Sequence, residues 1–559
     1  MSAEPQSPPW HRNLATWRRI RRHAVPRPMI ERAAERREAG DWRGACAAAN
    51  VDVRFDLDAV AREHGTQAAA RLADDLRHLA PDLLRWNLPR VGCGRTTIVP
   101  QLVIALARYG DDGFPHRDGL HDDSGGLGLY VVTPMFVNGS QRLKLILRPG
   151  PRETTDWTGE RHLFDVRHSG GLLAHCGGGP DRAPFFHADG TLRTAAELPA
   201  SPPAPEDASA HAEWALLLHE RGDLAEAFDA VGIDLSLERR PGHPAWFDEP
   251  SSMFAAMALS PPMIARAVAE RAAGPAAGPD GAVTLCIEGG WARTVVLEAG
   301  GARARPLARS GHRWGGDEDA APLAEHHWRR PPDLELLRAE MITPEELHPL
   351  VRSALFPARP AAEGPVGPPG TWRPEPVRVR CRGEWHEVRS GGGGLEMPHS
   401  LDEQRRERAL EALGGAVSGC FAVHRVWRTG KGRLPRGLRE QRREVFLRVQ
   451  HGDTEGVLAL LDAGLDPFVR DGRKRTLMHQ LYTMDHTVML PRLLDAGLGL
   501  EDLDHHGRTP LHIAVGDHGS AALVRALVDA GAHTDVSDDN GTDVKQMIEL
   551  RGREDLDWL

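Results

Sequence analysis

The sequence predicts a multidomain protein in which two α+β modules precede a C-terminal all-α solenoid. Three observations lead to this fold class. A pattern in the last fifth of the chain returns with a period of 33 to 34 residues. A weaker similarity relates two segments of the N-terminal half and indicates that the α+β modules are duplicated. Tracts rich in proline or glycine, which cannot bury enough apolar surface to order themselves, separate these regions.

The C-terminal repeat is visible in two short patterns. Leu460–Gly464 returns as Leu493–Gly497 and again as Leu527–Gly531, and Thr476–His479 returns as Thr509–His512. A fixed period of this length is typical of stacked supersecondary units, each of which buries its apolar face against its neighbours. Such a solenoid commonly offers an extended binding surface.

The most complete unit, residues 504–532, resembles the ankyrin repeat. It contains Gly507-Arg508-Thr509-Pro510-Leu511-His512 and ends with Leu527-Val528-Asp529-Ala530-Gly531-Ala532. Thr509 can cap the N-terminus of a helix, and Pro510 suits the first turn, where its missing N–H costs nothing. Gly531 can end the second helix in a left-handed conformation. The resemblance implies a structural role for the His512 ring, in hydrogen bonds with Thr509 and its neighbours.

By this resemblance, residues 441–559 divide into units at about 442–470, 471–504 and 505–538, followed by a degenerate cap at 539–559. The residues expected to maintain the ankyrin fold are Thr476, His479, Gly507, Thr509, Pro510, Leu511, His512, Gly464, Gly497 and Gly531. In similar proteins a partner binds to the hairpin tips and the concave helix face. The tip positions expected to bind a partner here are Arg473, Lys474, Arg475, His505, His506, Arg508, Asp539 and Asn540.

The two predicted α+β modules cover residues 1–198 and 210–356. Glu38–Ala45 is similar to Glu220–Ala227 at an offset of 182 residues, and each segment predicts a helix, a Gly-Asp turn whose aspartate caps the next helix, and a second short helix. Each copy is followed by a hairpin-like pair of apolar runs, around Asn138-Gly139 and Gly289-Gly290. Residues 372–440 predict a small hairpin, with a flexible glycine joint at 391–394, and a helical connector.

Composition and charge restrict the possible partners. No apolar run is long enough to span a bilayer and no signal peptide is visible, so we expect a cytoplasmic protein with no membrane contact. Arginine supplies 65 of the 69 basic residues, which is typical of a bacterial genome rich in G and C. Residues 444–559 hold 11 basic and 21 acidic side chains, which argues against nucleic acid as the ligand. A protein partner with a basic surface fits this charge, and solubility alone explains it equally well.

Arginines crowd a predicted N-terminal helix that also carries Trp10 and Trp17. We expect a solvated arginine face with the tryptophans in the core, and contact with nucleic acid or anionic lipid is the alternative. The arginines concerned are Arg18, Arg19, Arg21, Arg22, Arg27, Arg32, Arg36 and Arg37.

Residues that could bind a metal form no recognisable pattern. The six cysteines lie far apart without a Cys-x-x-Cys pair, so we predict neither a zinc site nor a cofactor. His116, Asp118 and His121 are weak candidates in a polar segment, and a solvated loop is the simpler interpretation. A second group has no known ligand spacing, and the pair His326-His327 is expected to be solvated. This second group consists of His162, His168, His175 and Cys176.

Two functional hypotheses follow. The first is a non-catalytic cytoplasmic protein-protein interaction or scaffold protein that uses its short ankyrin stack. The second is an enzyme or toxin-like effector within residues 1–356, with the stack as a targeting module. A further possibility is that the repeats only pack against the helices at 401–450, because short arrays need capping neighbours.

Overall fold

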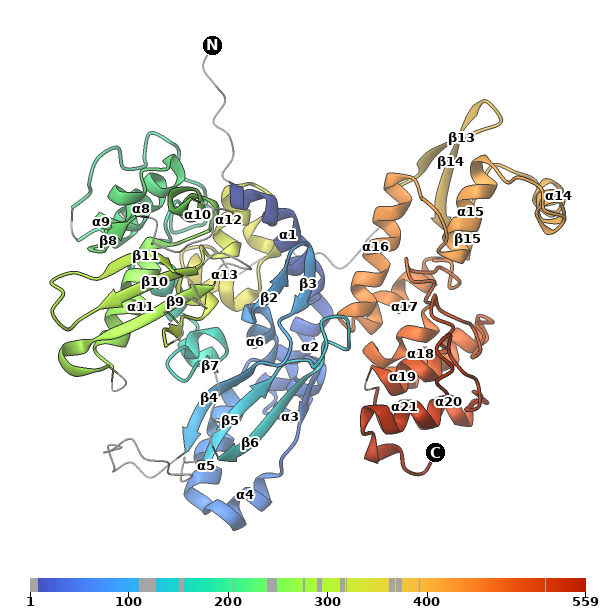
Figure 1. The fold of residues 1–559 in the computed structure, drawn as a ribbon, viewed down its shortest axis with the longest axis horizontal. Coiled ribbons are helices and arrows are strands. Elements are labelled where there is room, and N and C mark those ends of the chain that lie inside the picture. The colour runs from blue at the N-terminus through green and yellow to red at the C-terminus, as the bar shows by residue number, and fades with distance from the viewer. Residues whose placement is uncertain are drawn as a thin grey trace.

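The computed structural model describes residues 9–559 except 110–126, 150–154, 205, 239–248, 275–276, 289–293, 312–316, 318, 361–366, 368–374, 392 and 518. Two modules of mixed helices and strands lie together, and a mainly helical C-terminal region lies beside them (Figure 1). Within the described residues, none of the helices has the length and apolar character needed to cross a bilayer.

The first module is a mixed five-stranded sheet with helices packed against it. The sheet has the order β1-β6-β5-β4-β7, in which β4, β5 and β6 are antiparallel and the edge strands β1 and β7 pair in parallel. Its strands are β1 (Val51–Val53), β4 (Val103–Tyr109), β5 (Leu127–Val132), β6 (Leu143–Pro149) and β7 (Thr155–Asp156), and a separate ribbon joins β2 (Arg90–Gly92) to β3 (Arg95–Ile98). The helices are α1 (Leu14–His23), α2 (Arg27–Glu38), α3 (Trp42–Ala48), α4 (Leu57–His64), α5 (Thr66–His78), α6 (Pro81–Asn87) and α7 (Gly171–His175).

The second module contains a sheet with the same arrangement. Its order is β12-β9-β10-β11-β8, again with three central antiparallel strands and two parallel edge strands. The strands are β8 (Asp234–Ser236), β9 (Val283–Glu288), β10 (Thr294–Ala299), β11 (Leu307–Gly311) and β12 (Ala321–Pro322). The helices are α8 (Ala208–Arg221), α9 (Leu224–Asp229), α10 (Pro250–Ala256), α11 (Pro261–Ala272), α12 (Pro332–Arg338) and α13 (Pro349–Leu355).

The Gly-Asp turns of the two modules differ in one detail. Asp41 caps α3 by accepting a hydrogen bond from the Gly44 N–H at 2.8 Å. Asp223 occupies the corresponding position before α9, but its side chain makes no capping bond.

The two apolar strand pairs predicted from the sequence are not equivalent in the two sheets. The first pair is β5–β6, whereas the second pair is β9–β10, which corresponds in position to β4–β5.

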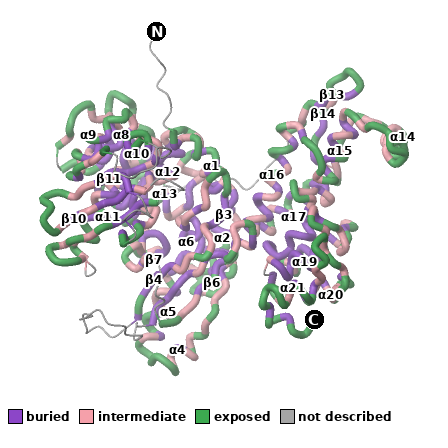
Figure 2. Tube along the Cα trace, viewed as in Figure 1, coloured by how far each residue is buried: buried purple, intermediate pink, exposed green. Residues whose placement is uncertain are grey.

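The last helices of the second module return to the first. Leu334 and Leu336 of α12 and Val351 and Leu355 of α13 belong to the core of the first module, whereas the second sheet has a separate core. Figure 2 shows the buried positions on the inner sides of the sheets and helices. The two modules are therefore joined by a continuous apolar interface.

The C-terminal region begins with a small three-stranded sheet, in the order β13-β14-β15. The strands are β13 (Val377–Cys381), β14 (Glu384–Gly391) and β15 (Gly394–Glu396), and they are followed by α14 (Leu401–Ala412) and α15 (Gly419–Thr429). Within the expected flexible joint, Gly391 pairs with Gly394 in the β14–β15 ladder. Gly393 takes a φ of 78°, which glycine adopts without strain.

Pairs of helices then stack to the end of the chain. They are α16 (Arg436–Gln450) with α17 (Thr454–Asp462), the 3₁₀ helix η7 (Met478–Thr483) with α18 (His486–Asp495), α19 (Pro510–Gly516) with α20 (Ala521–Asp529), and finally α21 (Val544–Arg551). Helix α16 runs continuously through residues 440 and 441, where the sequence suggested a domain boundary. Its buried Leu438 and Val445 belong to the same core as the later repeats.

The stack docks on the first module as well as on the connector. Thr96 Oγ1 lies 2.8 Å from His451 Nε2, the Tyr482 hydroxyl donates to the Asn138 carbonyl at 3.2 Å, and Arg443 donates to the Gly94 carbonyl at 3.3 Å. The repeats thus pack against more of their own chain than the helices at 401–450.

The N-terminal arginines are not a uniformly solvated face. Arg21 is 5% exposed and forms an ion pair with Asp333 of α12. Arg22 lies 3.2 Å from Glu444 of α16, and Arg32 pairs with Glu455 of α17. The prediction of a solvated face was wrong for Arg21, whose carboxylate partner is 312 residues away in the sequence, whereas Arg22 is half-buried and Arg32 is exposed.

Candidate binding groove and junction cluster

The loops between successive repeats share a turn that is built on an aspartate. Asp471 Oδ1 accepts hydrogen bonds from the N–H groups of Arg473 and Arg475, at 2.7 and 2.9 Å. Asp504 makes the same pair of bonds in the next loop, and Asp538 makes it in the last. These side chains fix the backbone of the hairpin tips. The sequence analysis did not single them out, although they repeat at the same 33- to 34-residue spacing.

The threonine-histidine pairs connect each repeat to the following one. His512 Nδ1 lies 2.9 Å from Thr509 Oγ1, and its Nε2–H donates to the Thr542 carbonyl at 3.3 Å. His479 makes the equivalent contacts with Thr476 at 2.9 Å and with the Arg508 carbonyl at 3.1 Å. Burial lowers the pKa of His479 to about 4, so the ring is neutral and can accept and donate at once.

A basic groove lies between α16, the first hairpin tip and η7. It encloses about 430 Å³, and Asn138 of the first module closes one side. Five arginines line it against one aspartate: Arg439, Arg442, Arg443, Arg473 and Arg475, with Asp471. Burial lowers the pKa of Arg442, and its neighbour Arg439 acts in the same direction. The groove therefore favours a negatively charged ligand.

Comparison with known families accounts for this architecture. Residues 445–538 match the family described as ankyrin repeats, in three copies. The C-terminal stack is an ankyrin-repeat array. The resemblance to ankyrin repeats, stated from Thr509–His512 and its earlier copy, is thereby confirmed.

One relative shares part of the sequence. The chain is 33% identical over 113 residues to the E3 ubiquitin-protein ligase KEG of Arabidopsis thaliana. The similarity covers 19% of this chain and 7% of that protein. The match is therefore partial, and most of both chains lies outside it.

The predicted tip residues of the ankyrin array do not form one exposed surface. Arg473, His506, Asp539 and Asn540 are exposed, and Lys474, His505 and Arg508 are half-buried. Arg475 is 5% exposed, and its guanidinium lies 4.0 Å from Asp517. Arg508 pairs with Asp504 within its own loop. Only Arg473 and Arg475 of this set line the groove, and the arginines of α16 add the residues that the sequence analysis missed.

A second candidate site lies where the two N-terminal modules meet. Four histidines surround one carboxylate, and we call this group the junction cluster: Glu160, His162, His175, His326 and His327. The Glu160 carboxylate lies 3.7 Å from His162 Nε2, 3.8 Å from His175 Nδ1 and 3.4 Å from His327 Nε2. The sequence analysis found no ligand spacing here and expected His326-His327 to be solvated, which is wrong because His327 is only 5% exposed. His168, by contrast, is exposed and stays apart.

Several ring nitrogens of the junction cluster make no hydrogen bond within the described part of the chain. His162, His326 and His327 each have a buried Nε2 without a hydrogen-bond partner among the described residues. The His175 Nε2–H donates to the His326 carbonyl at 2.9 Å, which directs its Nδ1 lone pair at Glu160. Burial lowers the pKa of His162 to about 2, of His175 to about 4 and of His327 to about 3. Burial also raises the pKa of Glu160 to about 7.

An apolar cavity of about 260 Å³ adjoins the junction cluster. His175 and His326 form part of its wall, and the Trp157 ring packs edge-on against His326 at 5.1 Å. Most of the remaining wall is apolar and comes from both modules, and it includes Trp86, Ile104, Leu172, Met263, Val351 and Leu355. A few converging polar groups beside an apolar cavity are typical of a small-molecule site. His116, Asp118 and His121, the weak candidates from the sequence, lie outside the described residues.

Proposed function

We propose that this chain is a non-catalytic cytoplasmic protein-protein interaction or scaffold protein whose ankyrin array binds an acidic segment of a protein. The observation that carries the proposal is the basic groove on the array. Its arginines present planar guanidinium groups that can bind carboxylates with two hydrogen bonds each. The exposed tip residues Arg473 and His506 extend the surface beyond the groove.

The charge of the groove changes the expected kind of partner. The net acidic count of residues 444–559 suggested a basic partner, but α16 begins at Arg436 and brings Arg439, Arg442 and Arg443 into the array. A long nucleic acid would meet the acidic remainder of the array, whereas a short acidic peptide meets only the groove. We therefore favour a protein ligand, with no membrane or nucleic acid involved.

Reversing two exposed groove charges should remove the partner. We expect Arg439→Glu together with Arg473→Glu to lower recovery of bound proteins about tenfold or more, because the ligand loses two charge-assisted contacts and meets two like charges. The measurement is affinity purification of the full chain followed by mass spectrometry. Arg436→Glu with Arg492→Glu is the matched control, since both arginines are exposed on the array and lie outside the groove.

The outcomes separate the alternatives. Proteins retained by the control and lost by the groove variant support the proposal. An unchanged set of proteins would mean that they bind outside the groove and would contradict the proposal. Capture of no protein by the unmodified chain would mean that the repeats only pack against their own chain, as the contacts of His451 and Tyr482 also allow. Captured nucleic acid that disappears with the groove variant would contradict the choice of a protein ligand.

The junction cluster supports a second candidate, an enzyme in residues 1–356 with the array as its targeting module. Histidine and carboxylate ligands suit a divalent transition metal, and the neighbouring cavity could hold a small apolar substrate. The relative's name, ubiquitin-protein ligase, describes a protein of which this chain matches 7%, so the cluster and not that name carries the alternative.

Manganese binding tests this second candidate. Mn²⁺ prefers nitrogen and oxygen ligands to thiolates, so we expect one Mn²⁺ per chain in electron paramagnetic resonance titrations of the metal-free protein. His162→Ala and His327→Ala should each weaken binding by at least about tenfold, as expected when one ligand or its support is lost. His168→Ala, an exposed neighbour, is the control. No binding, or binding that survives both variants, would exclude a metal enzyme at this site.

We also propose that the two N-terminal modules are copies of one ancestral unit. The shared strand order and the similarity at an offset of 182 residues support this. The 3₁₀ helices η2 (Arg161–Leu163) and η5 (Glu325–His327), which follow β7 and β12, contribute His162 and His327. The junction cluster would then lie where equivalent parts of the two copies face each other.

A further inference from the structure

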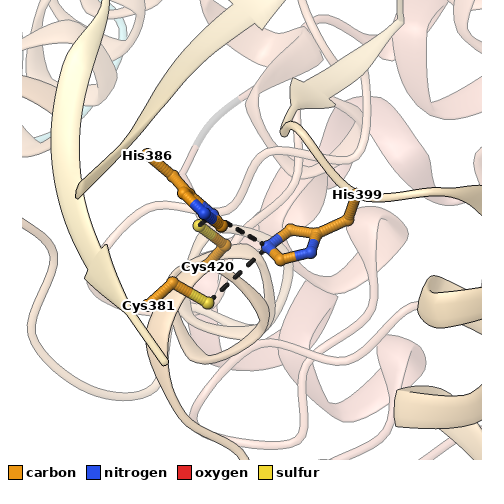
Figure 3. A group of neighbouring side chains, drawn as sticks. All are labelled: Cys381, His386, His399 and Cys420. Atoms are coloured by element: carbon orange, nitrogen blue, oxygen red, sulfur yellow. Dashed lines mark hydrogen bonds between the residues drawn. The ribbon is translucent and has the colours of Figure 1, made fainter. Parts of the chain in front are cut away.

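Two cysteines and two histidines meet beside the small sheet that precedes the array. Cys381 ends β13, His386 lies on β14, His399 lies in the loop before α14, and Cys420 is in the first turn of α15. Figure 3 shows the four side chains pointing toward one another. Their ligand atoms all lie within 4.8 Å of one another. No zinc site was predicted from the sequence, because these two cysteines are far apart and form no Cys-x-x-Cys pair.

The distances fit a tetrahedron around one zinc ion. Zinc bonds of about 2.3 Å to sulfur and 2.0–2.1 Å to nitrogen, at tetrahedral angles, place sulfur and nitrogen about 3.6 Å apart and two nitrogens about 3.3 Å apart. Cys381 Sγ lies 3.6 Å from His399 Nε2, and Cys420 Sγ lies 3.6 Å from His386 Nδ1. The two histidine nitrogens are 3.2 Å apart. These three distances thus already match edges of a zinc tetrahedron, and the remaining pairs of ligand atoms lie within 4.8 Å of one another.

The surroundings support a structural site and not an open catalytic one. Cys381 is 2% exposed and Cys420 is fully buried, and the Phe421 ring covers His399 at 4.5 Å. The outward nitrogens face carboxylates, with His399 Nδ1 3.9 Å from Glu403 and His386 Nε2 3.9 Å from Glu384. Carboxylates behind zinc-binding histidines orient the rings and increase their basicity. Four protein ligands leave no position for water or substrate.

We infer that Cys381, His386, His399 and Cys420 bind one Zn²⁺, and that this zinc site closes the N-terminal end of the ankyrin array. Binding releases the two thiol protons and leaves two thiolates on the metal, so it weakens as the pH falls. An array of repeats needs a cap over the apolar face of its first unit. The zinc site holds the sheet and α15 together in that position.

The contacts between this cap and the array are direct. Cys381 and Cys420 belong to the same apolar core as Val457 and Leu461 of the first repeat. Trp427 of α15 is fully buried, and its carbonyl accepts a hydrogen bond from the Arg470 N–H at 3.2 Å. The Gly393 N–H donates to the Gly464 carbonyl at 3.0 Å. Loss of the metal would therefore loosen the end of the array and not the hairpin alone.

Metal analysis of the full chain tests the site. We expect one equivalent of zinc that survives dialysis, and a Co²⁺-substituted protein with a thiolate-to-cobalt charge-transfer band. The band identifies this site, because the junction cluster contains no thiol ligand. Cys420→Ser should abolish the band and the tightly bound zinc. Cys46→Ser, which changes another buried free thiol in α3, should keep both.

The wild-type result decides the matter even if Cys420→Ser does not fold. No stoichiometric zinc and no thiolate band in the wild-type chain would overturn the inference, as would a band that persists in Cys420→Ser. A disulfide between Cys381 and Cys420, detected by mass spectrometry without reduction, would also overturn it. The capping role predicts that a zinc chelator lowers the unfolding temperature of the wild-type array and leaves that of folded Cys420→Ser unchanged. An equal effect of the chelator on both proteins would overturn that role.

Discussion

Replacement of Asp333 by alanine is expected to destabilise the N-terminal modules by about 3–5 kcal/mol, because it removes one partner of a buried ion pair. The Asp333 carboxylate accepts hydrogen bonds from Arg21 at 2.5 and 3.1 Å, and from the Trp86 indole N–H at 3.0 Å. Both charged residues are less than one-tenth exposed. The substitution therefore leaves the Arg21 guanidinium buried, and among the described residues the Trp86 carbonyl at 2.8 Å is its remaining acceptor.

Urea denaturation followed by tryptophan fluorescence measures this loss. The double variant Arg21→Leu with Asp333→Leu should recover a large part of the stability, since it removes both buried charges together. Glu31→Ala is the control, because the exposed pair Arg27–Glu31 on α2 should contribute less than about 1 kcal/mol. A loss below about 1 kcal/mol in Asp333→Ala would show that the pair does not join α1, α6 and α12 as described.

Local patterns made the ankyrin array predictable. Thr509, Pro510 and His512 act within a few residues of one another, so their spacing in the sequence is also their geometry in the fold. The same reasoning gave the helix and turn pairs of the N-terminal modules. It placed the first repeat at about residue 442, whereas α16 begins at Arg436, because this helix retains none of the motif and only its apolar spacing reveals it.

The two clusters could not be predicted because long-range packing creates them. Cys381 and Cys420 are on different elements, and strand β14 and the loop before α14 each bring in one of the histidines between them. His162 and His326 are the middle residues of η2 and η5, and they lie 164 residues apart (326 minus 162), whereas the module starts repeat at an offset of 182. Different loop lengths therefore hide their correspondence. A comparison of the modules element by element would have aligned these two histidines.

The groove shows a related difficulty with charge. A charge count that begins at residue 444 leaves out Arg439, Arg442 and Arg443, which belong to α16, the first helix of the array. The net charge of residues 444–559 is therefore negative, whereas the groove that these residues help to form is basic. Contacts in the fold, and not the sum along the chain, determine the charge that a ligand meets.

Acidification from pH 7.5 to 5.5 is expected to lower the stability of the folded chain by about 5 kcal/mol through four buried histidines alone. Burial lowers the pKa of His23 and His219 to about 3 and that of His479 to about 4, and it lowers the pKa of His451 far below its usual value. Arginines add to the effect, with Arg448 near His23, Arg330 near His219, and Arg90 and Arg85 near His451.

The direction follows from proton binding. Below about pH 6.5 the unfolded chain protonates these histidines while the folded chain keeps them neutral, so unfolding takes up protons and becomes more favourable. Each histidine contributes about 1.4 kcal/mol in total between pH 7.5 and pH 5.5, because the unfolded-state pKa of about 6.5 lies at the middle of this interval. The stability is fully present above the unfolded pKa and falls as the pH decreases toward the folded values. The junction cluster is outside this sum, because the pKa values of Glu160 and its histidines shift in opposite directions and a bound cation would fix their protonation.

Denaturation curves at the two pH values, compared among variants, test the argument. His219→Gln can still donate to the Phe254 carbonyl that His219 Nε2 contacts at 3.2 Å, and it has no proton to gain. Its stability should therefore change by about 1.4 kcal/mol less between pH 7.5 and 5.5 than that of the wild type. His533→Gln, at an exposed position, should match the wild-type change. Equal pH dependence in all three proteins would mean that His219 is protonated in the folded chain, and that its burial between Trp10 and Arg330 does not hold in solution.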